Sequence, residues 1–134
     1  MIQLVPITAL YASLCAILLI GLAFNVVGQR RKNKVIFGDQ DVEPLALAIR
    51  SHGNAIEYIP IALFLILVLE LNGARAPLLH GLGGALVIGR LLHAWGLSHS
   101  GGGSFGRFYG TLITWMVILG AATTNLVWIV RSYW

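Results

Sequence analysis

The chain has 134 residues, of which 57% are hydrophobic and 10% charged, and a formal net charge of +4. Soluble domains carry about 25% charged residues, so this composition excludes intrinsic disorder and disfavours a soluble fold, including a soluble nucleic-acid-binding protein. The length supports one small domain, and the only cysteine, Cys15, allows neither an internal disulfide nor a cysteine metal cage.

The first apolar segment, residues 4–28, contains no charged residue. It exceeds the roughly 20 residues that a helix needs to cross the hydrocarbon core of a bilayer. A cleaved signal peptide would have a basic start, a shorter apolar core and a small-residue cleavage site, and none is evident. The segment is therefore predicted to be a retained membrane helix.

A long loop follows at residues 29–44, and its charges are divided along its length. It begins with a basic cluster and then turns acidic, with Pro44 suited to the first turn of the next helix. The basic residues are Arg30, Arg31, Lys32 and Lys34, and the acidic ones are Asp39, Asp41 and Glu43.

Three further apolar segments lie at residues 45–71, 77–97 and 107–131. They are too long for membrane β-strands of about 10 residues and lack alternation. The sequence therefore predicts one domain over residues 1–134, an all-α integral membrane protein built as a four-transmembrane-helix bundle. Residues 98–106 are expected to form a flexible turn.

Small residues recur every fourth position in the third segment, at Gly81, Ala85 and Gly89. Such a ridge lets two helix backbones approach closely, so it predicts tight helix packing and carries no chemistry.

The distribution of Lys and Arg predicts the orientation of the bundle. Cytosolic loops of membrane proteins carry the excess of these residues, which places both chain ends outside, in the periplasm, and residues 29–44 in the cytosol. The opposite side of the membrane is poorer in cations. One side carries Arg30, Arg31, Lys32, Lys34 and Arg107, and the other carries Arg75 and Arg131.

The second segment places ionisable and amide side chains on one helical face. At about 100° per residue, Arg50, Asn54 and Glu57 fall within an arc of about 60°, and His52 lies close by in sequence. An ionised residue near the centre of a membrane helix costs about 2.5–3.5 kcal/mol, so such residues pair or bind a ligand. Two interpretations stay open: an internal Arg50–Glu57 bridge that holds the bundle together, and a binding site.

Two other segments add polar groups at the same level. Arg90 and His93 lie one turn apart in the third segment, Arg107 begins the fourth, and Arg30 lies on the same side. This convergence favours a pocket for an anionic ligand that also carries a cation. The four histidines show no paired metal-ligand spacing, so no metal site is expected.

These motifs are similar to those of the MAPEG family, the membrane-associated proteins in eicosanoid and glutathione metabolism. The resemblance covers nearly the whole chain and rests on Arg50-x-x-x-Asn54-x-x-Glu57-Tyr58 with Pro60, on Gly89-Arg90-x-x-His93, and on Arg107. It implies a homotrimer with glutathione bound between neighbouring subunits near the cytosolic face. By resemblance, the glutathione site comprises Arg30, Arg50, His52, Asn54, Glu57, Tyr58, Arg90, His93 and Arg107.

The resemblance also implies an activity. At Leu97 the prostaglandin E synthase branch has a tyrosine, so a microsomal glutathione transferase-like member, in a bacterial inner membrane, is the closer match. Such an enzyme conjugates the glutathione thiolate, its co-substrate, to hydrophobic electrophiles from the bilayer, with glutathione peroxidase activity as a further expectation. Arg107 is the catalytic candidate, because a guanidinium favours the thiolate form of a thiol.

Two other classes of function stay open. The first is a non-catalytic scaffold that binds lipid or glutathione and serves a partner protein. The second is a channel or transporter for small polar solutes, which the sequence supports less because it shows no inverted repeat and its charges gather at one side.

Overall fold

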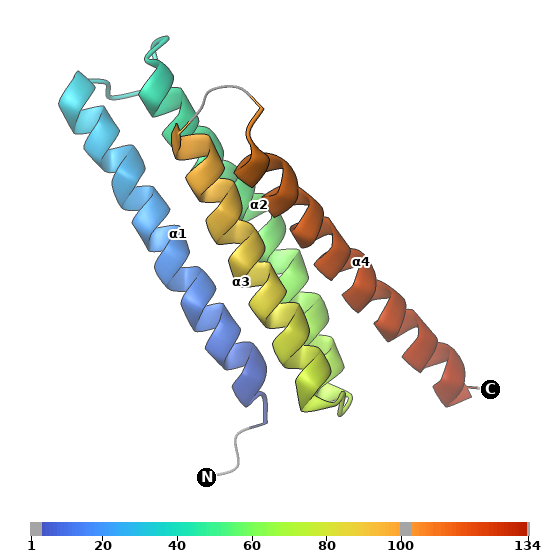
Figure 1. Ribbon diagram of the computed structural model, residues 1–134. Helices are drawn as coiled ribbons and strands as arrows, with labels where there is room; N and C mark the ends of the chain where they lie inside the picture. Colours follow the sequence, from blue (N-terminus) through green and yellow to red (C-terminus); the bar gives the residue numbers. More distant parts are fainter. Residues whose placement is uncertain (1–3, 100–102, 134) are drawn as a thin grey trace.

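The computed structural model describes residues 4–99 and 103–133, and in this part the chain is all-helical. Four helices follow one another in the order α1 (Pro6–Asn33), α2 (Glu43–Leu71), α3 (Ala76–His99) and α4 (Phe105–Tyr133). Each is long and apolar enough to cross a membrane. They lie side by side, with both chain ends at one end of the bundle and the α1–α2 loop at the other (Figure 1). Part of the turn expected at residues 98–106 lies outside the described residues.

Helix α1 extends to Asn33, beyond the expected end at residue 28, so the basic cluster is largely helical. The physical reason is electrostatic, because cations in the last turn interact favourably with the partial negative charge of a helix C-terminus. The helix ends where Lys34 adopts a left-handed conformation with φ 56°. The N–H of Val35 then donates to the Arg30 carbonyl at 3.0 Å, which closes the helix end.

Helices α2 and α3 each touch all of the other helices, whereas α1 and α4 do not touch within the described residues. Helix α2 has one buried face. Its buried stripe recurs every third or fourth residue, as expected for one helical face. The stripe consists of Leu45, Ala48, Ser51, Ala55, Ile59, Ala62, Ile66 and Leu69. Cys15 and Leu22 of α1, Leu86 of α3 and Ala121 of α4 complete the core.

Helices α3 and α4 approach each other through glycines. A Cβ added to Gly110 would lie 2.6 Å from both the Gly89 carbonyl oxygen and the His93 nitrogen, and one added to Gly106 would lie 2.6 Å from the Leu92 carbonyl oxygen. The nearest contacts at these two positions are backbone atoms, which cannot easily give way, so no larger side chain fits there. Gly96 completes this glycine crossing, since its added Cβ would meet the backbone nitrogen of Arg107.

The predicted ridge of Gly81, Ala85 and Gly89 is therefore wrong as a continuous contact surface. Gly89 does lie in the crossing, but a Cβ on Gly81 would meet nothing within 4 Å. Helix α1 instead approaches α3 at Gly83, where the Tyr11 ring occupies the space of a side chain. The Tyr11 hydroxyl reaches His80 Nδ1 at 3.1 Å, which ties α1 to α3 at the end that holds the termini.

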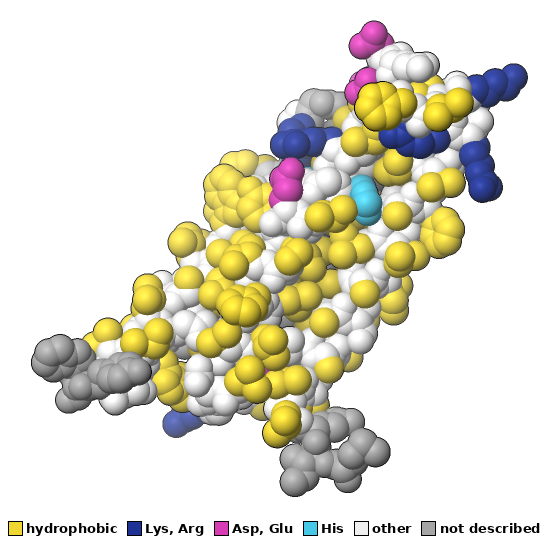
Figure 2. Space-filling model, turned by 180° about the vertical axis from the view of Figure 1, so that it is seen from behind, with side chains coloured by type: hydrophobic (Ala, Val, Ile, Leu, Met, Phe, Trp, Pro, Cys, Tyr) yellow, Lys and Arg dark blue, Asp and Glu magenta, His cyan; other side chains and the backbone are white. Residues whose placement is uncertain are grey.

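The surface separates apolar from charged side chains. Figure 2 shows a broad hydrophobic belt over the length of the helices and most of the charged groups gathered at one end. That end carries the α1–α2 loop and the start of α4, where the candidate site residues lie.

Candidate functional site

The charged face of α2 is on the outside of the bundle. Arg50 Nη1 lies 3.8 Å from Glu57 Oε1, and the two side chains are 65% and 54% exposed. The Arg50–Glu57 pair thus exists, but its interpretation as an internal bridge is wrong, because it lies on the outer face. An exposed pair of this kind contributes little to stability, about 0–1 kcal/mol. Acyl chains solvate ionised groups poorly, so exposure of this pair to lipid would be costly.

Asn54 and Tyr58, on the same helix, face Arg90 of α3. Arg90 is 2% exposed, and its Nη1 donates to Asn54 Oδ1 at 2.7 Å. Its guanidinium carbon lies 5.7 Å from the centre of the Tyr58 ring, within the range of a cation–π contact. Arg90 therefore fixes the orientation of two predicted site residues on α2.

The remaining donors of Arg90 are directed to α4. Its Nε donates to Thr114 Oγ1 at 3.0 Å and its Nη2 to the Gly110 carbonyl at 3.4 Å. Thr114 in turn donates to the same carbonyl at 2.8 Å. A guanidinium has five N–H donors, and in the described structure Arg90 forms three hydrogen bonds with them, to acceptors on α2 and α4. Arg90 is thus a buried residue that links α3 to α2 and α4.

His93 lies one turn beyond Arg90 and is 4% exposed. Its backbone packs against Gly110 of α4 in the glycine crossing. The charges of Arg90, Arg107 and Arg50 all act on its imidazole. The ring therefore lies at the end of the bundle where three helices each contribute an arginine.

Arg107 lies in the first turn of α4, three residues after Ser104, which caps the helix. The Arg107 N–H donates to Ser104 Oγ at 3.3 Å, and Thr111 Oγ1 donates to the Arg107 carbonyl at 2.9 Å. Serine at this position satisfies a free N–H of the first helical turn. The Arg107 side chain is half-buried, and it forms no ion pair with an acidic residue in the described part of the chain.

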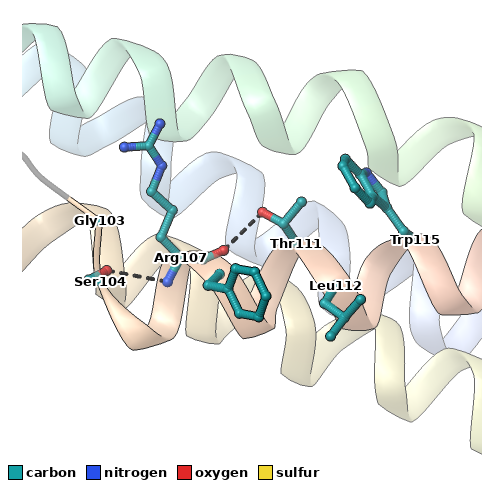
Figure 3. Close-up of a pocket in the computed structure, with 7 residues that line it drawn as sticks. Gly103, Ser104, Arg107, Thr111, Leu112 and Trp115 are labelled. Atoms are coloured by element: carbon teal, nitrogen blue, oxygen red, sulfur yellow. Dashed lines mark hydrogen bonds between the residues drawn. The ribbon is translucent and has the colours of Figure 1, made fainter.

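A groove of about 320 Å³ runs along this part of α4. Arg107, Thr111 and Trp115 lie on one side of the helix and Leu112 on the other (Figure 3). The groove therefore has a cation at one end and an aromatic ring at the other. It is lined by Gly103, Ser104, Arg107, Phe108, Thr111, Leu112 and Trp115.

Two predicted site residues are not brought into contact with the others among the described residues. The guanidinium of Arg30 donates to the carbonyls of Ile36 at 3.2 Å and Gly38 at 3.0 Å, so it holds the α1–α2 loop. His52 is half-buried on α2, one residue past the buried Ser51.

Sequence reasoning missed the residues of α4 that support the site. Thr114 and Gly110 hold Arg90, and Phe108 and Trp115 form the groove beside Arg107. The sequence did contain one signal for these residues, their helical spacing. Arg107, Gly110 and Thr114 are separated by three and four residues, so they share one face of α4. That face meets α3 only in the folded bundle.

The comparisons with known proteins agree with this architecture. A sequence model of the MAPEG family matches residues 8–127. The chain is 43% identical over 125 residues to the inner membrane protein YecN of Escherichia coli K12, with 90% of each chain covered, and equally to YecN of Escherichia coli O6:H1. The four apolar helices and the match over most of the length lead to one conclusion: the chain belongs to the MAPEG family.

Proposed function

We propose that this protein is a membrane-bound glutathione transferase, which conjugates the glutathione thiolate to hydrophobic electrophiles. The observation that carries the proposal is the exposed Arg50–Glu57 pair on a membrane-spanning helix. A cation and an anion at 3.8 Å, open to the outside, match a ligand that has both carboxylates and an ammonium group. Family membership supports the same ligand class.

Each charged group of glutathione is assigned to a residue of opposite charge. Arg50 and Arg107 match carboxylate or thiolate groups, since guanidinium forks bind anions with paired hydrogen bonds. Glu57 takes the ammonium, and Asn54, held by Arg90, is a further polar contact. His52, Tyr58 and His93 complete the walls, and Arg30 reaches the site only if it leaves the loop carbonyls.

Assembly into a homotrimer is part of the proposal. The charged face of α2 lies on the outside of the single chain, so a neighbouring subunit is needed to close the site and exclude lipid. The groove beside Arg107 is open as well and would receive the electrophile from the bilayer.

The proposed reaction is a substitution at carbon. The thiol proton leaves to solvent, the thiolate attacks the electrophilic carbon, the carbon–sulfur bond forms and the leaving group departs with its electron pair. Only the thiolate is a good nucleophile, and Arg107 is the residue that would stabilise it. With a lipid hydroperoxide in place of the carbon electrophile, the thiolate would attack the terminal oxygen, the O–O bond would break, and the lipid alcohol would leave. The sulfenic acid of glutathione that forms would react with a second glutathione to give glutathione disulfide and water, which is a glutathione peroxidase reaction.

The test is a pair of measurements on the protein in detergent or nanodiscs: glutathione binding by calorimetry and conjugation of an aryl halide. We expect Glu57→Gln to weaken glutathione binding about tenfold or more, the loss typical of a charge-assisted hydrogen bond. Glu43→Gln, an exposed carboxylate at the start of α2, is the matched control and should leave binding unchanged. Absence of glutathione binding by the folded native protein would overturn the proposal.

A second candidate is a non-catalytic scaffold that binds glutathione or lipid. One observation favours it: two predicted ligand cations, Arg30 and Arg90, are engaged with the protein itself. In that case glutathione binds but aryl halides and hydroperoxides are not turned over. The two measurements above separate the candidates.

We further propose that the protein lies in a bacterial inner membrane with both termini in the periplasm. The support is the inner-membrane relative and the concentration of cations at the end opposite the termini. A reporter enzyme that is active only in the periplasm should be active when it is fused after Trp134. Activity of a reporter that requires the cytosol would place the site at the other membrane face.

A further inference from the structure

The α1–α2 loop presents two apolar side chains among exposed cations. Ile36 is 94% exposed and Phe37 is 87% exposed, although the next residue towards α1, Val35, is only 4% exposed. Neither side chain is needed for the packing of the bundle. Ordinary aqueous loops are polar, so a fully exposed Ile–Phe pair marks a surface that meets something apolar.

The loop has a defined conformation. Arg30 donates to the carbonyls of Ile36 and Gly38, and the buried Val35 anchors the first loop residue against the bundle. Gly38 has a positive φ of 64°, which turns the chain directly after Phe37. The apolar pair is therefore held outwards by the fold and does not project from a loose segment.

The position of Arg30 indicates how deep Ile36 and Phe37 lie relative to the bilayer. The charge-free part of α1 ends before Arg30, so this residue marks the boundary between the hydrocarbon and the headgroups. Because its guanidinium bonds the carbonyls on both sides of Phe37, the loop folds back beside the last turns of α1. Ile36 and Phe37 thus lie at the level of the lipid headgroups, which is a favourable place for apolar and aromatic side chains beside cations.

The charges around the pair are complementary to an anionic surface. Arg31, Lys32 and Lys34 are exposed, and among the described residues none of them forms an ion pair. The acidic residues of the loop follow Gly38, where Asp39 accepts the N–H of Asp41 and forms a separate turn. Figure 2 shows basic, acidic and apolar side chains together at this end of the molecule.

We propose that Ile36 and Phe37 insert into the leaflet that surrounds this end of the bundle, while Arg31, Lys32 and Lys34 bind the headgroups of anionic phospholipids. The loop is then an interfacial lipid-binding element, independent of whether the protein binds glutathione. Basic residues near a membrane surface each favour anionic lipid, and the apolar pair adds the contact with the acyl region.

The test uses an environment-sensitive fluorophore at a single introduced cysteine. Cys15 is 1% exposed in the core, so a thiol reagent reacts selectively with Phe37→Cys, and the native chain serves as the labelling control. Asp39→Cys, two residues away and exposed, is the matched position. In bilayers, the label at position 37 should be quenched by lipids brominated near the headgroup and shielded from aqueous iodide. The label at position 39 should show the reverse.

A second measurement identifies the lipid class. In mixed bilayers, brominated phosphatidylglycerol should quench the label at position 37 at least about twofold more than brominated phosphatidylcholine does, because the cations enrich anionic lipid. The added Lys32→Gln and Lys34→Gln substitutions should abolish this preference. If Phe37→Cys does not fold, Ile36→Cys provides the same measurement.

Three results would overturn the proposal. Equal quenching of both positions by iodide would place the loop in water. Shielding of position 37 from both iodide and bromolipid would assign the pair to a contact with another copy of the chain. Equal quenching by the two lipids would remove the role of the anionic headgroup.

Discussion

Glu70, at the C-terminal end of α2, caps the start of α1 through Thr8. Its two carboxylate oxygens accept the N–H groups of Ile7 at 2.8 Å and Thr8 at 2.6 Å. The residue before α1, Val5, has no side chain that could do this. The first helical turn of the chain is thus satisfied by a residue more than sixty positions away, and a carboxylate is the charge that a helix N-terminus favours.

Loss of this cap should destabilise the protein. We expect Glu70→Ala to lower the free energy of unfolding by about 0.5–2 kcal/mol, the range for removal of a helix cap. Glu70→Gln keeps one acceptor oxygen and should lose less. Thermal unfolding in detergent gives the ranking, and hydrogen exchange should show faster exchange in the first turn of α1. Equal stability of all three proteins would contradict the capping role.

Substitution of Arg90 should damage both stability and the proposed site. Arg90→Lys retains the charge but loses the fork that joins Asn54 to Thr114, and we expect a loss of about 1–3 kcal/mol from unpaired buried groups. Glutathione binding should weaken as Asn54 loses its orientation. Thr114→Val is the control, because it removes one Arg90 contact while the bond to Asn54 stays. If Arg90→Lys binds glutathione normally, Arg90 does not position Asn54.

The glycine crossing predicts a position-specific effect of a single methyl group. Gly110→Ala brings a Cβ to 2.6 Å from backbone atoms of Gly89 and His93, so the helices must separate, at a cost of about 1–3 kcal/mol. Gly120→Ala on the same helix meets only Leu82 at 3.9 Å. It should be neutral or stabilising by up to about 1 kcal/mol, since alanine favours helix more than glycine does. Chemical denaturation of both variants measures the contrast.

Arg107 is predicted to activate the thiol of bound glutathione. In Arg107→Ala the pKa of that thiol should rise towards the unperturbed value of about 8.5 for a thiol. At neutral pH the thiolate fraction then falls, and turnover falls with it, while glutathione still binds. Ultraviolet absorbance of the thiolate against pH measures this pKa. An unchanged pKa in the variant would assign Arg107 to a role in binding or in lipid contact, with Arg30 or Arg31 as the next candidates for activation.

The sequence predicted the four helices because apolar length is a local property. It also predicted that Arg50 and Glu57 share a face, because helical geometry fixes their angle. It could not predict that this face points outwards, since that depends on which side of α2 packs against the other helices. The end of α1 at Lys34 was missed for a related reason, because the basic residues suit both a loop and a helix C-terminus.

The contacts that hold the site residues in place could not be predicted from the sequence for another reason. The contacts of Arg90 with Gly110 and Thr114, and of Glu70 with Thr8, join residues distant along the chain. Each is a short polar contact that forms only after the helices have packed. Arg90 was expected to bind the ligand, and the structure shows it bonded to the protein around it.

Helix α4 is held unevenly along its length. Its first turns are locked to α3 by the glycine crossing, and Asn125 Nδ2 still donates to the Leu65 carbonyl of α2 at 3.1 Å. Beyond Asn125 the side chains of Leu126, Ile129 and Val130 are exposed, and the helix diverges from its neighbours (Figure 1). Within the single chain, the last turns of α4 are therefore held by fewer contacts than its first turns, so the position of Arg107 depends on the glycine crossing and not on the far end of the helix.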